Sequence, residues 1–78
     1  MLLFVYNVPN KYNVDNVYEH FTDLGVHVKD LWKRSHQDAR KKSFVVKIPK
    51  DELDYVLEDD MMESLSIRVR EYTDYSDQ

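Results

Sequence analysis

Two pairs of residues near the ends of the chain have the type and spacing suited to binding chemistry. Phe4 and Tyr6 are two residues apart, as are Arg68 and Arg70. Residues two apart in an extended strand point to the same face, so each pair could act together. An aromatic ring can stack on a nucleobase, and a guanidinium group can contact a phosphate or stack on a base plane. The four side chains are therefore candidates for binding a ligand that carries planar rings and phosphates.

The basic residues gather in the middle of the sequence. The net charge of the 78 residues is −4, but residues 29–50 hold eight of the 11 basic residues and only two of the 15 acidic ones. Such an asymmetry predicts a basic face on the folded chain, unless the two signs interleave on its surface and cancel. Within this segment Arg40, Lys41 and Lys42 are consecutive. They are candidates for holding a phosphate backbone, which would make binding depend on salt without selecting a base sequence.

No group of residues has the spacing of a catalytic or metal-binding site. His20, His27 and His36 lack metal-ligand spacing, and His20 falls on the solvent side of a predicted helix. Asp59 and Asp60 fall at a helix end, where a solvated acidic surface is the simplest explanation. The chain has no cysteine, no glycine-rich phosphate loop and no serine nucleophile motif. We therefore expect neither an enzyme nor a bound metal or cofactor.

The spacing of apolar residues predicts six elements that would position the candidate side chains. Alternation or a β-branched and aromatic run predicts a strand, and apolar residues at intervals of three and four predict a helix. Asn13 and Gly25 have the types expected just before and just after the first helix. The predicted elements are strands over residues 2–8, 26–32, 42–48 and 65–72 and helices over residues 14–24 and 51–62.

The order of these elements, β-α-β-β-α-β, predicts an α+β fold of the ferredoxin-like type if the connections are right-handed. Such a fold is a four-stranded antiparallel sheet with two helices on one face, and its other face stays open. Residues 1–73 would form this one domain, with residues 74–78 as a polar tail. Alternation places Phe4 and Arg68 on the open face. Trp32 and the leucine before it break the alternation of their strand, so a bulge is expected there. Trp32 could then face the core, a partner protein or a nucleobase.

Several segments resemble the RNA recognition motif family, and together they cover nearly the whole chain, from residue 2 to residue 72. They share the order of aliphatic, aromatic and asparagine positions in that family's first strand and the four-residue steps of its first helix. The matching segments are residues 3–9 (Leu-Phe-Val-Tyr-Asn-Val-Pro), the helix positions Val17, Phe21 and Gly25, the third-strand residues 41–48 and the fourth-strand residues 67–69.

The third strand departs from the pattern of that family. The family's motif begins with a basic residue, a glycine and an aromatic residue, and a second aromatic residue follows two positions later. Here Lys42 stands at the glycine position, Ser43 at the first aromatic position and Val45 at the second. The segment Lys-Lys-Ser-Phe-Val-Val-Lys-Ile-Pro, followed by a helix and a short strand, is also similar to degenerate motifs of retrotransposon gag-like proteins, although the Trp-Pro usual there is missing. RNA binding is therefore expected to be weak.

The resemblance implies a non-catalytic module that binds single-stranded RNA on the open face of the sheet. An alternative is a protein-interaction or dimerisation domain, which would use the same face or the acidic helix 51–62, with Tyr55 and Met62 partly outward. No apolar run is long enough to span a membrane, and the apolar residues 1–8 are too short for a secretory signal. We therefore expect an intracellular protein, cytoplasmic or nuclear, without a membrane partner. The predicted RNA-binding residues are Phe4, Tyr6, Trp32, Arg40, Lys41, Lys42, Val45, Arg68 and Arg70.

Overall fold

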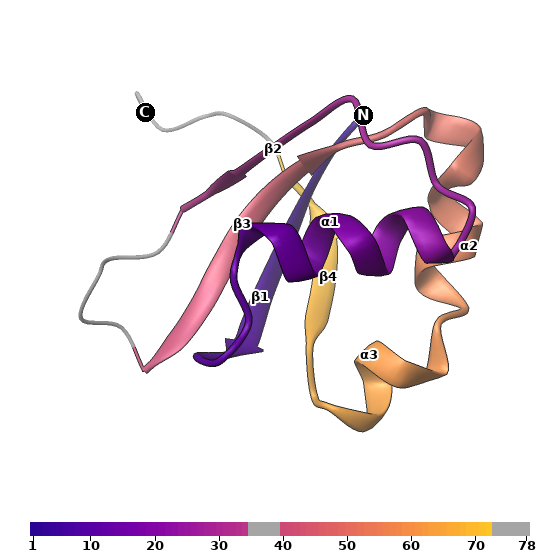
Figure 1. Cartoon of the computed structure of the whole chain (residues 1–78). Helices are drawn as coiled ribbons and strands as arrows, with labels where there is room; N and C mark the ends of the chain where they lie inside the picture. The colour runs from indigo at the N-terminus through magenta and orange to yellow at the C-terminus, as the bar shows by residue number, and fades with distance from the viewer. Residues whose placement is uncertain (35–39, 73–78) are drawn as a thin grey trace.

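The computed structural model describes residues 1–34 and 40–72, and its fold is α+β, as predicted (Figure 1). The predicted polar tail 74–78 and most of the predicted loop over 33–40, with His36, lie outside the described residues. The described elements, in chain order, are β1 (Leu2–Pro9), α1 (Val14–Asp23), β2 (Asp30–Lys33), β3 (Lys41–Lys47), a 3₁₀ turn (Lys50–Glu52), α2 (Leu53–Leu57), α3 (Asp60–Ser64) and β4 (Arg68–Glu71).

The strands form one antiparallel sheet in the order β2-β3-β1-β4. In the central strand β1, Val5 pairs with Phe44 of β3 on one side and with Val69 of β4 on the other. Directly paired residues of antiparallel strands point to the same face. Because Val5 and Phe44 are both buried, this face of the sheet is the inward one, and the residues that alternate with them point to the opposite face.

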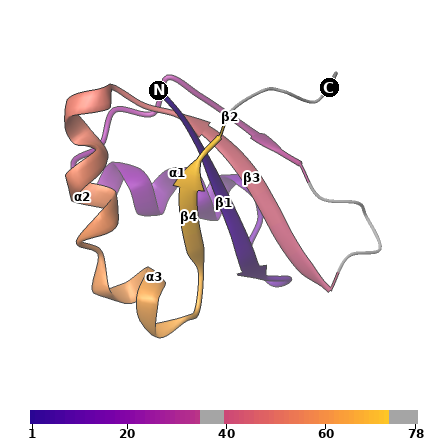
Figure 2. The same cartoon turned by 180° about the vertical axis from the view of Figure 1, so that it is seen from behind.

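The described helices pack on the inward face of the sheet (Figures 1 and 2). Val17 and Phe21 of α1 lie four residues apart, on one side of the helix, and both are buried. Val56 of α2 and Met62 of α3 belong to the same core. None of the described helices has the length and apolar composition needed to cross a membrane. The strands and the residue after β3 add Leu3, Val5, Val8, Phe44, Val46 and Ile48 to the core.

Both ends of α1 follow the sequence prediction. The side-chain oxygen of Asn13 accepts a hydrogen bond from the N–H of Asn16 (3.1 Å), and the side-chain oxygen of Asn16 accepts one from the N–H of Asn13 (2.9 Å). This reciprocal arrangement is a capping box, which satisfies backbone donors that the first helical turn leaves without partners. Gly25, just beyond the helix, has φ +86°, a conformation that glycine adopts without a steric penalty.

A bulge in β1 resets which side chains of this strand point inward. The pairing with β3 is interrupted between Val5 and Val8, and Asn7 in this interval has φ +61°. Asparagine tolerates this left-handed conformation better than most residues, and its side chain donates a hydrogen bond to the carbonyl of Ser66 (2.8 Å). Regular alternation would turn Val8 away from the core, but the bulge returns it there, and Val8 is buried.

The second strand is shorter than predicted, because β2 begins at Asp30 and not at Val26. Val26 is buried and Val28 packs against the core, as predicted, but neither lies in the strand. Leu31 is the next residue that packs against the core. Since Val28 and Leu31 are three positions apart, no regular strand can turn both inward. The chain therefore joins the sheet only at Asp30, after the alternation has changed between Val28 and Leu31.

The second predicted helix is broken, which corrects the expectation of one helix over residues 51–62. α2 ends at Leu57 and α3 begins at Asp60. The carboxylate of Asp59, at the break, accepts a hydrogen bond from the N–H of Met62 (3.3 Å) and lies 2.5 Å from Nε2 of His20 on α1. Acidic side chains also oppose the dipole at the C-terminal end of a helix. The helix is therefore interrupted at Asp59, which caps α3 and pairs with His20.

Three smaller expectations about this part of the chain are also wrong. The side chain of His20 is only 24% exposed and pairs with Asp59, so it is not the solvated histidine that the helical pattern predicted. Met62 is buried rather than partly outward, whereas Tyr55 is 52% exposed, as predicted. The last strand begins at Arg68 and not at residue 65, because the chain first turns at Ser66, where φ is +62°.

Candidate nucleic-acid interface

The face of the sheet opposite the helices carries most of the predicted binding residues, and we refer to it as the open face. Figure 2 shows the sheet from this side, with α1 behind it. Strand pairing places Phe4 opposite Arg70 and Tyr6 opposite Arg68. The aromatic pair and the arginine pair, both predicted to lie on the open face, are thus direct neighbours on adjacent strands. The residues of the open face, taken from pairing and alternation, are Leu2, Phe4, Tyr6, Asp30, Trp32, Lys41, Ser43, Val45, Lys47, Arg68, Arg70 and Tyr72.

Three aromatic side chains form a row on the open face. The rings of Phe4 and Tyr6 have centroids 5.4 Å apart and planes at 18°, so they are stacked, and the ring of Tyr72 lies 5.9 Å from Phe4 at 33°. All three residues are partly exposed. We call Phe4, Tyr6 and Tyr72 the aromatic row. Tyr72 was not among the predicted binding residues, although its alternation with Arg70 placed it on this face.

The guanidinium group of Arg70 lies over the aromatic row. Its central carbon is 5.0 Å from the centroid of Phe4 and 5.8 Å from that of Tyr6, within the distance of a cation–π interaction. Arg68, two residues before Arg70 in β4, pairs with Tyr6 and is exposed. The structure therefore brings Phe4, Tyr6, Arg68 and Arg70 together, as the sequence predicted.

Trp32 and Val45 continue the open face across β3 and β2. Val45 pairs with Phe4 on one side and with Trp32 on the other, so Trp32 faces away from the core, and the residue is 38% exposed. Val45 points to the same side but has no exposed surface. It supports the rings beside it and does not offer a contact to a ligand, so its prediction as a binding residue needs this correction.

The three consecutive basic residues separate on folding. Lys41 pairs with Pro9 and is exposed on the open side, and Arg40 is exposed just before it. Lys42 points the other way, toward the helices, because it alternates with Lys41. Its ammonium group donates a hydrogen bond to the carbonyl oxygen of Tyr12 (2.7 Å), so Lys42 is not on the predicted interface. Lys47, which the prediction omitted, is exposed on the open face.

Charge divides between the two sides of the molecule. Among the described residues of the open face, Lys41, Lys47, Arg68 and Arg70 are basic and Asp30 is acidic. The helices and the 3₁₀ turn instead carry mainly acidic residues, which gives the helical side the negative charge of the chain. These acidic residues are Asp15, Glu19, Asp23, Asp51, Glu52, Asp54, Asp60 and Glu63. The open face is therefore a basic surface on a chain whose net charge is negative.

A pair of titratable side chains, His27 and Glu52, lies away from the open face. The backbone N–H of His27 donates to Oε1 of Glu52 (2.7 Å), and Nδ1 of the same histidine lies 2.6 Å from Oε2. These hydrogen bonds, the backbone one first, hold the pKa of Glu52 below its usual value. In the part of the chain that the structure describes, no three His, Cys, Asp or Glu residues are grouped so that they could hold a metal ion.

Comparisons with known proteins add no relative from which a function could be transferred. No model of a protein family matches the sequence, and no curated protein is significantly similar to it.

Proposed function

We propose that this chain is a non-catalytic domain of the ferredoxin-like, RNA-recognition-motif type that binds single-stranded RNA weakly through its open face. The observation that carries the proposal is the aromatic row of Phe4, Tyr6 and Tyr72 beneath Arg70, on the side of the sheet away from the helices. The strand order β2-β3-β1-β4 supports the fold assignment. An RNA ligand would place the protein in the cytoplasm or the nucleus.

Bases would stack on the aromatic row while basic side chains around it hold the phosphates. Stacking on an aromatic side chain contributes about 1–3 kcal/mol per base. Arg68 lies at one side of the row, and Lys41 and Lys47 lie on β3 at the other. Their contacts with phosphates would make affinity fall as salt rises. Affinity is expected to be low, because the β3 positions beside the row hold Ser43 and the buried Val45, which offer no ring.

The proposal is tested by titrating the protein with a fluorescent eight-nucleotide RNA of mixed sequence at 50 and 200 mM salt. The variant Phe4→Ala removes the central ring of the row. Tyr18→Ala is the matched control, because Tyr18 is a 48% exposed aromatic residue on α1, on the other side of the molecule.

We expect Phe4→Ala to weaken binding roughly five- to 150-fold, which corresponds to the loss of one stacked base. Tyr18→Ala should bind like the unmodified protein, and binding should weaken at the higher salt concentration. An unchanged affinity of Phe4→Ala, or an affinity that does not depend on salt, would show that the open face is not an RNA site.

A protein-interaction or dimerisation domain is the second candidate. The observation that favours it is the exposed ring of Trp32 next to the buried Val45, because apolar surface around an aromatic anchor is also typical of protein interfaces. Sedimentation of the unmodified protein and of Trp32→Glu distinguishes the two functions. A dimer that Trp32→Glu abolishes, together with no response to RNA, would favour this candidate.

A further inference from the structure

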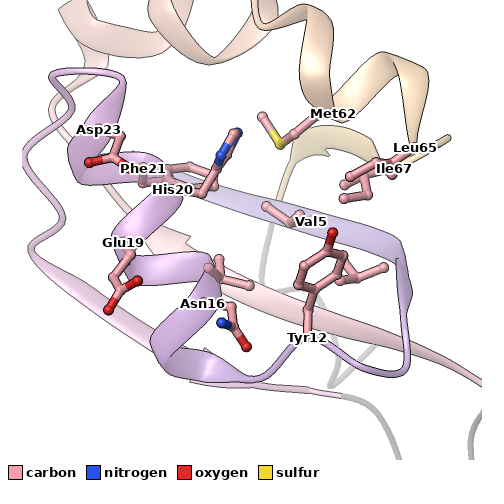
Figure 3. Close-up of a pocket in the computed structure, with 12 residues that line it drawn as sticks. Val5, Tyr12, Asn16, Glu19, His20, Phe21, Asp23, Met62, Leu65 and Ile67 are labelled. Atoms are coloured by element: carbon pink, nitrogen blue, oxygen red, sulfur yellow. The ribbon is translucent and has the colours of Figure 1, made fainter.

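A groove on the helical side of the molecule lies between α1 and α3 (Figure 3). Val5 forms part of its floor, and the side chains of Met62, Leu65 and Ile67 face α1 across it. The ring of Tyr12 lies at the end of the groove near the start of α1. The groove is therefore apolar at its base and is separated by the sheet from the open face.

The size of the groove restricts what it can hold. Its volume is about 200 Å³, below the roughly 300–1,000 Å³ of pockets that bind small molecules and cofactors. A space of this size suits one large apolar side chain. An apolar side chain presented by another chain would bury the partly exposed side chains of Tyr12, Leu65 and Ile67, and burial of apolar surface is the main source of stability in such contacts.

The break between α2 and α3 holds the groove in place. Asp59 caps α3 through the N–H of Met62 and at the same time pairs with His20 of α1. The two walls of the groove, α1 and α3, are thus joined by one carboxylate at the His20 end. The groove belongs to the folded chain and does not need a ligand to form it.

The rim of the groove is acidic at the end nearer to His20. Glu19 and Asp23 of α1 line it there and are exposed, and none of its lining residues is lysine or arginine. Asp23 is the last residue of α1, where the helix dipole is also negative and attracts cations. At the opposite end, Lys11 lies over the ring of Tyr12 (5.4 Å). A bound cation is therefore favoured at the Asp23 end.

We propose that this groove binds a basic peptide segment of a partner protein, which inserts one large apolar side chain between α1 and α3 and places a lysine or arginine beside Glu19 and Asp23. The site lies on the opposite side of the sheet from the proposed RNA surface. The peptide and the RNA would therefore bind without competing.

The test uses the ¹⁵N-labelled protein and the capped peptide Lys-Lys-Leu-Lys-Lys, followed by chemical-shift changes. Two comparison peptides replace the leucine with alanine or the lysines with glutamates. We expect the leucine peptide to shift the amides of Phe21, Met62 and Ile67, and both comparison peptides to lose most of this response.

Charge reversal at the rim separates a specific site from general attraction to an acidic surface. Glu19→Lys combined with Asp23→Lys should weaken peptide binding by about tenfold or more. Asp51→Lys combined with Asp54→Lys reverses the same charge away from the groove and should have little effect.

Equal weakening by both double variants, or shifts confined to the open face, would overturn the proposal. Binding that depends on the rim but not on the leucine would also overturn it. Shifts at the same amides that depend on protein concentration, without any peptide, would instead assign the groove to a second copy of the chain and would overturn it as well. The peptide titration is carried out without RNA, so its outcome does not depend on whether the RNA proposal fails.

Discussion

Replacing Asp59 with alanine removes the contact that joins α1 to the start of α3. The side chain of Asp59 is 9% exposed and that of His20 is 24% exposed, so their 2.5 Å contact is largely shielded from water. The same carboxylate accepts from the N–H of Met62 at 3.3 Å. Alanine would leave the N–H of Met62 and the ring of His20 without this acceptor.

The expected loss follows from these two contacts. A hydrogen bond to a charged group contributes about 1.5–3 kcal/mol, and an N-cap contributes about 0.5–2 kcal/mol, with the long distance to Met62 favouring the lower end. Asp59→Ala should therefore reduce the free energy of unfolding by about 2–3 kcal/mol. For a domain of this size, such a loss lowers the melting temperature by roughly 10–20 °C.

Urea and thermal unfolding followed by circular dichroism measure this effect. Asp60→Ala is the matched control, because Asp60 is the exposed neighbour of Asp59, and it should change stability by less than about 0.5 kcal/mol. Asp59→Asn keeps a capping oxygen and should lose less than Asp59→Ala. The double variant Asp59→Ala with His20→Ala should lose about 1 kcal/mol less stability than the sum of the two single losses. Additive losses, or equal midpoints for Asp59→Ala and Asp60→Ala, would refute the role given to this carboxylate.

Two further predictions concern contacts at element ends. Folding lowers the pKa of Glu52 from its usual 4.5 through the hydrogen bonds of His27. The charged carboxylate therefore stabilises the fold above pH 4.5. This contribution is lost as the pH falls through the lower pKa of the folded state. Urea midpoints of Glu52→Gln and the unmodified protein should therefore differ at pH 7 and converge in acid; a difference that stays constant with pH would contradict this. Asn13→Ala breaks the capping box with Asn16 and should cost about 1 kcal/mol, whereas Asn13→Asp should retain most of the stability; equal urea midpoints for the two variants would argue against the cap.

Local patterns predicted the parts of the fold in which near neighbours decide the structure. The alternation of β3 and the residue after it correctly turned Phe44, Val46 and Ile48 inward, because these three apolar residues share one side of the chain. The cap at Asn13 and the glycine after α1 were also predicted, since both act within a few residues of the helix. The shared face of Phe4 and Arg68 followed from the same alternation.

The features that sequence patterns missed depend on partners far along the chain. Asp59 breaks the second helix by pairing with His20, which is 39 residues away, and no helical period contains this information. Asn7 forms the bulge of β1 with a hydrogen bond to Ser66, 59 residues away. Lys42 has the type suited to phosphate binding, but it lies on the same side of β3 as Phe44 and donates to the carbonyl of Tyr12, 30 residues away. The groove also escaped prediction, because it depends on the helix break.

The guanidinium group of Arg70 covers part of the proposed stacking surface. A base that approaches Phe4 must either displace the guanidinium group or slide beneath it and form the middle layer of a sandwich. Displacement forfeits a contact of about 0.5–1 kcal/mol, whereas the sandwich keeps the cation and adds a second stacked plane. Arg70→Ala separates the two routes: tighter binding at high salt would indicate that the arginine is a competitor for the rings, and weaker binding would indicate that it closes over the base.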